Sequence, residues 1–251
     1  MKATRIEFRL RMAINTAIIT LGFWAPWIGV IAPPTGFASR ISLLEWLALQ
    51  LSRFGLASFT LAAPIVIVLG ALVAALGAVL RVWGTAYLGP ATVLHWDMQA
   101  DGVMANGPYR CVRNPLYLGL WCTVAAMALI MPPTGALFTL VLLTVFLLRL
   151  ILGEEAFLTE QLDEPYLAYL NAVPRILPRL RSELPRSGAR PQWIRSVLSE
   201  LFPIGVFVTL AFLSWSYNNQ LMMKAVLISF GFSLVARALV PSSRAQLSNR
   251  S

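Results

Sequence analysis

Long apolar runs separated by short polar breaks dominate the pattern of hydrophobic and polar positions along the chain. About 20 apolar residues, at about 1.5 Å per residue in a helix, are needed to cross a hydrocarbon core of about 30 Å. Six runs reach or approach that length, at residues 12–32, 61–83, 115–132, 135–152, 201–217 and 221–239. The pattern therefore predicts an all-α fold, a polytopic membrane helical bundle of about six transmembrane helices.

The breaks between the runs predict how the helices are connected. Residues 132–134 alone separate the third run from the fourth, and residues 218–220 alone separate the fifth from the sixth, so each pair should form a tight antiparallel hairpin. Residues 40–60 mix apolar and charged positions, which suits either a helix at the outer membrane interface or a partly buried connecting helix. The first run has no small-residue cleavage site before Pro33, so we expect it to be retained as a membrane helix.

The composition agrees with this pattern and excludes a soluble protein. Hydrophobic residues make up 58% of the chain and charged residues 12%, with a mean hydropathy of +0.71, values outside the range of soluble globular domains. The formal net charge of +9 would suggest nucleic-acid binding in a soluble protein, but here the basic residues lie at the edges of apolar runs, where they meet anionic lipid headgroups. We therefore expect the lipid bilayer as a partner and no nucleic acid.

The distribution of Lys and Arg predicts the orientation. These residues gather in the N-terminal tail, after the second run, in residues 153–200 and after residue 239. If six helices alternate in direction, all four regions lie on one side, which the positive-inside rule identifies as the cytoplasm. Both termini should then be cytoplasmic in a multi-pass integral membrane protein. The sizeable polar regions, 84–114 and 153–200, are predicted to face this side, the second with an amphipathic helical segment, so we expect any chemistry there.

The sequence GPYRCVRNPLYLG, residues 107–119, places a polar cluster where the third run begins. Asn114 followed by Pro115 is typical of a helix start, because Asn caps free N–H groups and Pro is tolerated at the first helical position. The positive end of that helix, together with Arg110 and Arg113, would suit an anion such as a carboxylate. Two arginines anchoring a helix at the lipid phosphates would explain the same charges, and the spacing alone leaves both interpretations open.

A second polar cluster follows the fourth run. Arg149 lies near the end of that run, and the adjacent carboxylates Glu154 and Glu155 follow within about a turn of the membrane edge. Paired acids beside an apolar span are costly unless they meet water, a cation or each other, so a ligand with an ammonium group and hydroxyls is a natural partner. The later acids of this segment are expected on a solvated helix face.

The few metal-binding residue types do not form a site. Cys111 and Cys122 lack CxxC spacing, and His95 is the single histidine, so neither a zinc site nor a disulfide framework is supported. We expect no metal. His95 lies too far from the polar clusters in sequence to be assigned as a general base.

Three motifs resemble those of the membrane methyltransferases that include isoprenylcysteine carboxyl methyltransferase and the phospholipid methyltransferases. They occur in the family's order and with matching gaps, as LRVWGTAYLG (80–89), GPYRCVRNPLYLG (107–119) and EEAFLTEQLDEPYLAYLNAVPRILP (154–178). The resemblance covers approximately residues 65–180. The chain departs from the pattern at Asn114, where the family usually has His, and at Leu162 and Asp163, where it has Phe-Gly. The change at Asn114 is similar to one in many bacterial members, which makes a bacterial inner (cell) membrane the expected location.

The resemblance implies an S-adenosylmethionine-dependent enzyme. The methyl donor would bind at the cytoplasmic end of the core helices, with its methyl directed toward a tunnel open to lipid and a lipid-like acceptor. The implied cofactor-binding residues are Gly107, Tyr109, Arg110, Arg113, Asn114, Pro115, Tyr117, Leu118, Gly119, Glu154 and Glu155. The residues implied for catalysis, or for closing the pocket and orienting the acceptor, are Arg149, Glu154 and Arg175.

The same interpretation divides the chain into three parts. Residues 1–60 are expected to hold the first transmembrane helix and the interfacial helix, residues 61–183 the methyltransferase core, and residues 184–251 the C-terminal transmembrane hairpin and tail. The oligomeric state and the acceptor group, a carboxylate, an amine or a hydroxyl, stay open.

Two alternatives from other classes are weaker. An NADPH-dependent membrane reductase of the steroid-reductase type would want basic phosphate-binding residues in 84–106, which contain no Lys or Arg. A non-enzymatic carrier or structural membrane protein would be expected to carry buried polar residues at mid-span and an internal repeat. The spans are nearly free of charge at their centres, and the sequence shows no internal repeat.

Overall fold

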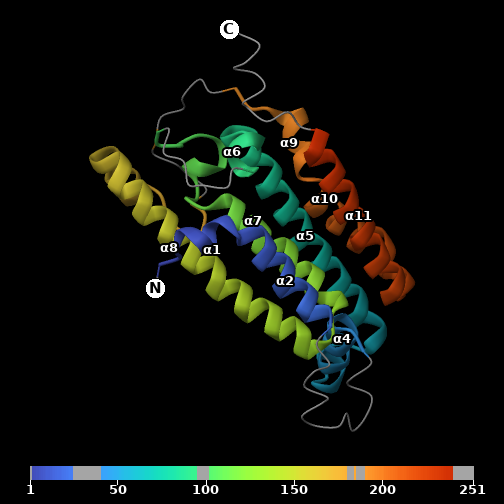
Figure 1. Cartoon of the computed structure of the whole chain (residues 1–251). Helices are drawn as coiled ribbons and strands as arrows, with labels where there is room; N and C mark the ends of the chain where they lie inside the picture. Colours follow the sequence, from blue (N-terminus) through green and yellow to red (C-terminus); the bar gives the residue numbers. More distant parts are fainter. Residues whose placement is uncertain (1, 25–40, 95–101, 180–183, 185–189, 240–251) are drawn as a thin grey trace.

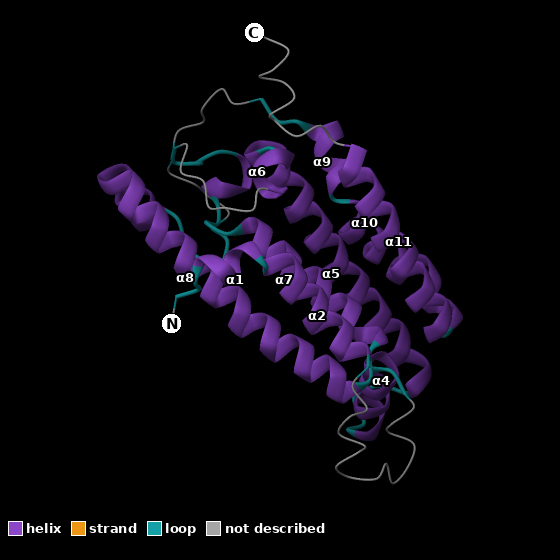
Figure 2. Cartoon of the chain, in the orientation of Figure 1, coloured by secondary structure: helices purple, strands orange, loops and turns teal. Residues whose placement is uncertain are grey.

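The computed structural model describes residues 2–24, 41–94, 102–179, 184 and 190–239. Throughout these residues the chain forms helices, turns and loops and no strand (Figure 2). The predicted all-α fold is therefore confirmed. His95, which the sequence left without a role, lies outside the described residues.

Helices cover the described part of every predicted apolar run. The bounds are α1 (Arg5–Arg9), α2 (Arg11–Phe23), α4 (Leu43–Arg53), α5 (Phe59–Leu88), α6 (Pro90–Leu94), α7 (Pro115–Met127), α8 (Pro133–Ala172), α9 (Trp193–Ser199), α10 (Leu201–Val208) and α11 (Asn219–Leu239). Shorter pieces are the 3₁₀ helices η2 (Gly107–Arg110), η3 (Ala128–Ile130) and η5 (Ser214–Ser216), and the π-helix η4 (Thr209–Leu213).

Three helices of the described chain are long and apolar enough to cross a membrane, namely α5, α8 and α11. A fourth span results if α9 and the helical stretch Leu201–Ser216 count as one, although they are bent by 68°. The apolar helices Arg11–Phe23 and Pro115–Ile130 are shorter. The prediction of a multi-helix membrane bundle is thus confirmed, and the count of six spans is not, in part because the first predicted run continues into residues outside the described ranges.

The long helices lie side by side in one bundle (Figure 1). Helix α5 packs against α7 on one side and α10 on the other, α10 packs against α11, and α2 packs against α8. Helix α4 lies at one end of the bundle, and the end of α5, the start of α7 and α9 lie at the opposite end (Figure 1). The polar segments of the sequence are gathered at this second end.

Helix α4 corresponds to the ambiguous residues 40–60. Its Leu44 and Ala48 are buried, at 2% and 0% exposure, and they pack against buried residues of α5 that include Ile67 and Ala62. The structure therefore shows a connecting helix that is partly buried against α5, and its position relative to the outer membrane interface stays a prediction.

Small residues let α5 and α7 approach closely. A Cβ atom at Gly77 would lie only 2.6 Å from Thr123 Oγ1 and 3.0 Å from the carbonyl oxygen of Gly119. One turn further along, a Cβ atom at Gly119 would lie 2.9 Å from Cγ of Arg81. Close backbone approach through small residues is a common way to pack helices in membranes. Here it places Arg81 of α5 against the first turns of α7.

Helix α8 continues past its apolar part and then bends back at Asp163, where the backbone is not helical and φ is 49°. After the bend, Tyr166, Tyr169 and Val173 form a small buried cluster with Leu158, on the stretch before the bend. Asp163 occupies the position of the glycine in the resembled motif, and its positive φ explains why glycine suits that position. The predicted helical segment after the fourth run is therefore present, and its cytoplasmic side stays a prediction.

Candidate functional site

Two polar clusters lie where α5 ends, α7 begins and α8 leaves its apolar part. The adjacent residues Glu154 and Glu155 of α8 each belong to one of them. Because successive residues on an α-helix are about 100° apart, at 3.6 residues per turn, neighbouring side chains point to different sides. The two carboxylates consequently meet different partners.

Glu155 lies in a cluster that fully engages its carboxylate. The residue is buried, with 6% exposure. Arg175 donates to Glu155 Oε2 from Nη2 at 2.7 Å and from Nε at 3.0 Å, and Arg113 Nη1 donates to Oε1 at 3.3 Å. Asn114 Nδ2 lies 3.3 Å from the same Oε1. Hydrogen bonds with Glu155 raise the pKa of Arg175 above its ordinary value. The negative charge of Glu155 is thus balanced by the protein itself.

Arg113 is also bound by the chain that returns after the bend. Its guanidinium donates to the carbonyl oxygens of Leu170 and Val173, and its backbone N–H donates to the carbonyl of Pro174 at 2.9 Å. From the sequence, Arg113 was predicted to bind the carboxylate of a ligand. In the structure these hydrogen bonds hold the stretch that follows the bend at Asp163, here called the return segment, against the start of α7. The return segment thereby brings Arg175 to Glu155.

Glu154 has a much less crowded carboxylate. Among the described residues its hydrogen-bond partner is Tyr117 of α7, whose hydroxyl donates to Oε2 at 2.9 Å. Arg11 of α2 lies within electrostatic reach of this pair. The Arg11 guanidinium is fixed over the ring of Phe8, 4.1 Å from its centroid, and donates to the carbonyl of Phe8 at 2.9 Å. The carboxylate oxygens of Glu154 can therefore accept further hydrogen bonds, and the positively charged Arg11 lies nearby.

Tyr109 of η2 contributes a buried hydroxyl to the same region. The residue is 7% exposed, and no hydrogen-bond partner for its Oη lies among the described residues. The pKa of Tyr109 is raised well above its ordinary value, mainly because the hydroxyl is buried and, to a smaller extent, because Glu154 is negatively charged. Tyr169 covers this turn from the return segment, since its hydroxyl donates to the Tyr109 carbonyl at 2.7 Å. A buried hydroxyl without a partner is costly and usually has an explanation, such as a ligand.

A third carboxylate borders the site from the C-terminal part of the chain. Glu200 lies at the bend between α9 and α10 with 1% exposure. Arg81 donates to it twice, from Nε to Oε2 at 2.8 Å and from Nη2 to Oε1 at 2.7 Å, and Thr85 Oγ1 donates to Oε1 at 2.7 Å. The positive charge of Arg81 partly offsets the rise in the pKa of Tyr109, which shows that the two side chains interact electrostatically. Neither Arg81 nor Glu200 was predicted from the sequence as a site residue. The available signal was the position of Glu200, a single acidic residue directly before the fifth apolar run.

The other predicted residues have varied surroundings. Gly107 has a φ of 54°, and a Cβ atom there would lie 2.3 Å from the ring of Tyr87, so the turn needs glycine. Pro115 begins α7 as predicted, but the predicted capping by Asn114 is wrong: its side chain makes no capping hydrogen bond and donates instead to Glu155 and to the Arg175 carbonyl. Arg110 Nε donates to the carbonyl of Leu184 at 3.1 Å. Leu118 is partly buried and makes no polar side-chain contact.

Arg149 binds the N-terminal helix. Its Nη2 donates to both carboxylate oxygens of Glu7 in α1, at 2.8 and 2.9 Å. The structure thus brings Tyr109, Tyr117 and Glu154 into one region, gathers Arg113, Glu155 and Arg175 in a second, and places Arg149 against a third element.

Comparison with known protein families gives one match. Residues 65–164 match the family model described as phospholipid methyltransferase, which confirms the resemblance found in the three motifs. The matched range contains Arg81, Tyr109, Tyr117 and both adjacent carboxylates, and it ends before Arg175 and Glu200. No curated protein and no solved structure matches the chain.

Proposed function

We propose that the chain is an integral-membrane methyltransferase that uses S-adenosylmethionine and methylates a lipid-like acceptor at the cytoplasmic membrane face. The observation that carries the proposal is the region around Glu154. It contains a carboxylate with spare acceptor capacity and a buried Tyr109 hydroxyl without a partner among the described residues, and it lies within the range that matches the phospholipid methyltransferase family.

The residues of this region fit the polar groups of the proposed donor. S-adenosylmethionine carries an ammonium group, a carboxylate and ribose hydroxyls. Glu154 can accept hydrogen bonds from an ammonium or from hydroxyls, and the protonated Tyr109 hydroxyl can donate to an oxygen or to a ring nitrogen. Arg11 supplies positive charge near the same region, which favours the carboxylate of the donor.

S-adenosylmethionine, when bound, supplies an electrophilic methyl group on a sulfonium. The protein's contribution is to position the reactants and to keep water out, and orientation alone can supply several kcal/mol of rate enhancement. Tyr169 and the return segment cover η2, and the tight packing of α5 on α7 fixes the opposite wall. Neither contribution requires a metal ion.

The acceptor is proposed to be amphiphilic because the site lies at the end of the apolar helices. The apolar part of α8 ends next to Glu154, and α5 presents many exposed apolar side chains, such as Leu72, Leu76 and Val79, along its length. A lipid with its reactive group at the headgroup level would reach this position. A carboxylate, an amine or a hydroxyl is compatible with this arrangement.

Calorimetric titration of the detergent-purified chain with S-adenosylmethionine and with NADPH tests the proposal. We expect S-adenosylmethionine to bind and NADPH not to bind. Tyr109→Phe should weaken donor binding about tenfold. The same change should raise the stability of the free protein by about 1 kcal/mol, because it removes a buried hydroxyl that has no partner among the described residues.

Binding of NADPH alone would overturn the proposal in favour of a reductase. Unchanged donor affinity in Tyr109→Phe would remove Tyr109 from the site. Transfer of a labelled methyl group into a total lipid extract would then identify the class of acceptor.

A further inference from the structure

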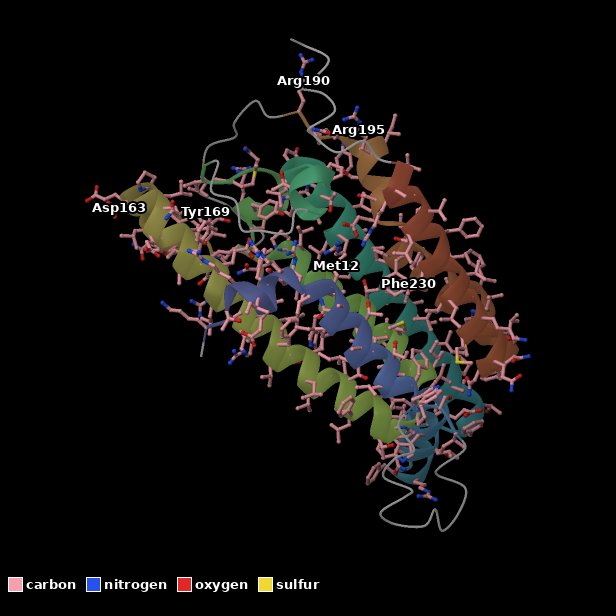
Figure 3. The ribbon with its side chains drawn as sticks, in the orientation of Figure 1. Met12, Asp163, Tyr169, Arg190, Arg195 and Phe230 are labelled. Carbon is pink, nitrogen blue, oxygen red and sulfur yellow. The ribbon has the colours of Figure 1, made fainter. Side chains whose placement is uncertain are left out.

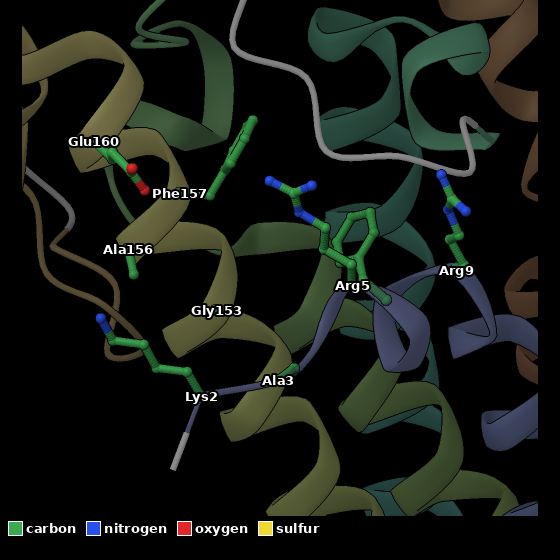
Figure 4. A pocket seen from close by; sticks show the side chains of 9 residues that line it. Lys2, Ala3, Arg5, Arg9, Gly153, Ala156, Phe157 and Glu160 are labelled. Atoms are coloured by element: carbon green, nitrogen blue, oxygen red, sulfur yellow. The ribbon is translucent and has the colours of Figure 1, made fainter.

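A pocket of about 530 Å³ lies between the N-terminal segment and α8 (Figure 4). Three cationic residues line it, Lys2, Arg5 and Arg9, and the acidic residue in its lining is Glu160. Arg5 and Arg9 are four residues apart on α1 and therefore share one face of that helix. The lining consequently carries a net positive charge.

The inner wall of the same pocket is apolar. Phe8 is buried with 6% exposure, and Ala156 and the partly buried Phe157 of α8 lie beside it. In Figure 4 the Arg5 side chain lies between the ring of Phe157 and the Arg9 side chain. An apolar wall with a cationic rim is suited to a molecule that has both an anionic group and a hydrocarbon part.

The N-terminal segment that carries these cations is held in place. The backbone N–H of Ala3 donates to the carbonyl of Arg149 at 3.0 Å, and Arg149 Nη2 pairs with Glu7 at 2.8 Å. Thr4 and Glu7 form a capping box at the start of α1. A Cβ atom at Gly153 would lie 3.2 Å from the carbonyl oxygen of Ala3, so the segment rests directly on α8. The pocket is therefore a feature of the packed structure.

The pocket lies along α8 at the depth where a lipid headgroup would be expected, just beyond the apolar part of the helix. The pocket begins at Gly153, directly after the apolar part of α8 predicted at 135–152, and extends about two turns further to Glu160. Beside the cations, Ile6, Leu10 and Met12 are exposed, at 69%, 48% and 44%. Exposed apolar residues next to a cationic pocket suit acyl chains that lie below a phosphate.

We propose that this pocket binds the phosphate of an anionic membrane phospholipid, with the acyl chains against the exposed apolar residues of α1 and α2. The site is separate from the proposed methyl-transfer site and adjoins it through Phe8, whose ring lies 4.1 Å from the Arg11 guanidinium carbon. In this proposal the ion pair of Arg149 with Glu7 positions α1, the helix that carries Arg5 and Arg9, against α8. The proposal does not depend on methyl transfer.

Native mass spectrometry of the full chain in detergent tests this site with phosphatidylglycerol as the probe, and with phosphatidylcholine and inorganic phosphate as comparison arms. The test variant is Lys2→Gln/Arg5→Gln. The matched control is Arg190→Gln/Arg195→Gln, which removes the same charge from exposed positions near α9 (Figure 3). All measurements are made without a methyl donor, so their outcome is independent of the proposed function.

We expect the wild type to bind phosphatidylglycerol more tightly than phosphatidylcholine, the test variant to bind it about 30-fold more weakly, and the control to bind it as the wild type does. Ala156→Phe, which fills the pocket without changing charge, should also weaken binding and covers the case in which the double variant does not fold. Equal losses in the test and control variants would overturn the proposal, because they would indicate a general charge effect. Equal binding of phosphatidylcholine, or inorganic phosphate bound as tightly as the lipid, would overturn it as well.

Discussion

Glu154 and Glu155 are chemically identical neighbours on one helix, and they have contrasting surroundings. Glu155 is buried and receives hydrogen bonds from two guanidinium groups and an amide. Among the described residues, Glu154 receives one from Tyr117, and the nearby Tyr109 hydroxyl has no hydrogen-bond partner. A carboxylate whose charge the protein already balances serves the fold, whereas one with spare acceptor capacity is available to a ligand. Helix geometry alone gives the two neighbouring carboxylates these different surroundings.

The largest effect is expected at Glu200, which is more deeply buried than Glu155, at 1% against 6% exposure. Glu200→Ala should lower the free energy of unfolding by about 4 kcal/mol, because it leaves the Arg81 guanidinium partly buried without its counter-charge. Unfolding of the purified protein in detergent measures this change. Arg81→Met/Glu200→Leu should recover most of the loss, since apolar replacement of a buried pair is often neutral. A double variant no more stable than Glu200→Ala would contradict this account.

A somewhat smaller loss is expected at Glu155. Glu155→Ala should cost about 3 kcal/mol, because Arg113 and Arg175 lose their shared partner and the return segment loses its attachment. Glu160→Ala, at an exposed position of the same helix, is the control and should change stability by less than about 0.5 kcal/mol. If the two variants unfold alike, the Glu155 cluster is not structural.

The apolar pattern allowed the helices to be predicted closely. The third run was predicted to begin at Pro115, and α7 begins there, because an Asn-Pro step sets a helix start locally. The departure from Phe-Gly at residues 162 and 163 hid the family signal for the bend, although Pro165 marks a helix break locally. The direction of the bend depends on contacts with distant residues, which a single sequence does not show. Nor could it show which helices are long enough to span a membrane once they are bent or joined.

The candidate site was predictable only as far as local motifs extend. The motifs placed Tyr109, Tyr117 and Glu154 in one region, as the structure does. They also assigned Arg113 to a ligand, and they could not show that its guanidinium donates to Glu155 and to the carbonyls of residues 170 and 173, far along the chain. Arg81 and Glu200 meet across 119 positions of the chain. Such long-range pairs leave no periodic or spaced signal in a single sequence.

The smallest effect is expected at the bend that brings Arg175 back to Glu155. Asp163 has a φ of 49°, where residues other than glycine are strained. Asp163→Gly should therefore raise the free energy of unfolding by about 1 kcal/mol without changing donor affinity. Thermal unfolding and donor titration of the same sample measure both quantities. Destabilisation by Asp163→Gly would mean that the aspartate side chain, rather than the backbone, sets the bend.

The most direct test of the contrast between the two carboxylates is to measure S-adenosylmethionine affinity and unfolding stability in Glu154→Gln and Glu155→Gln side by side. For Glu154→Gln we predict donor binding at least about tenfold weaker, with stability within about 1 kcal/mol of the wild type, because the amide oxygen can still accept from Tyr117. For Glu155→Gln we predict clearly lower stability and, below its unfolding temperature, donor affinity close to that of the wild type. The reverse result, weak donor binding in Glu155→Gln and normal binding in Glu154→Gln, would contradict the account.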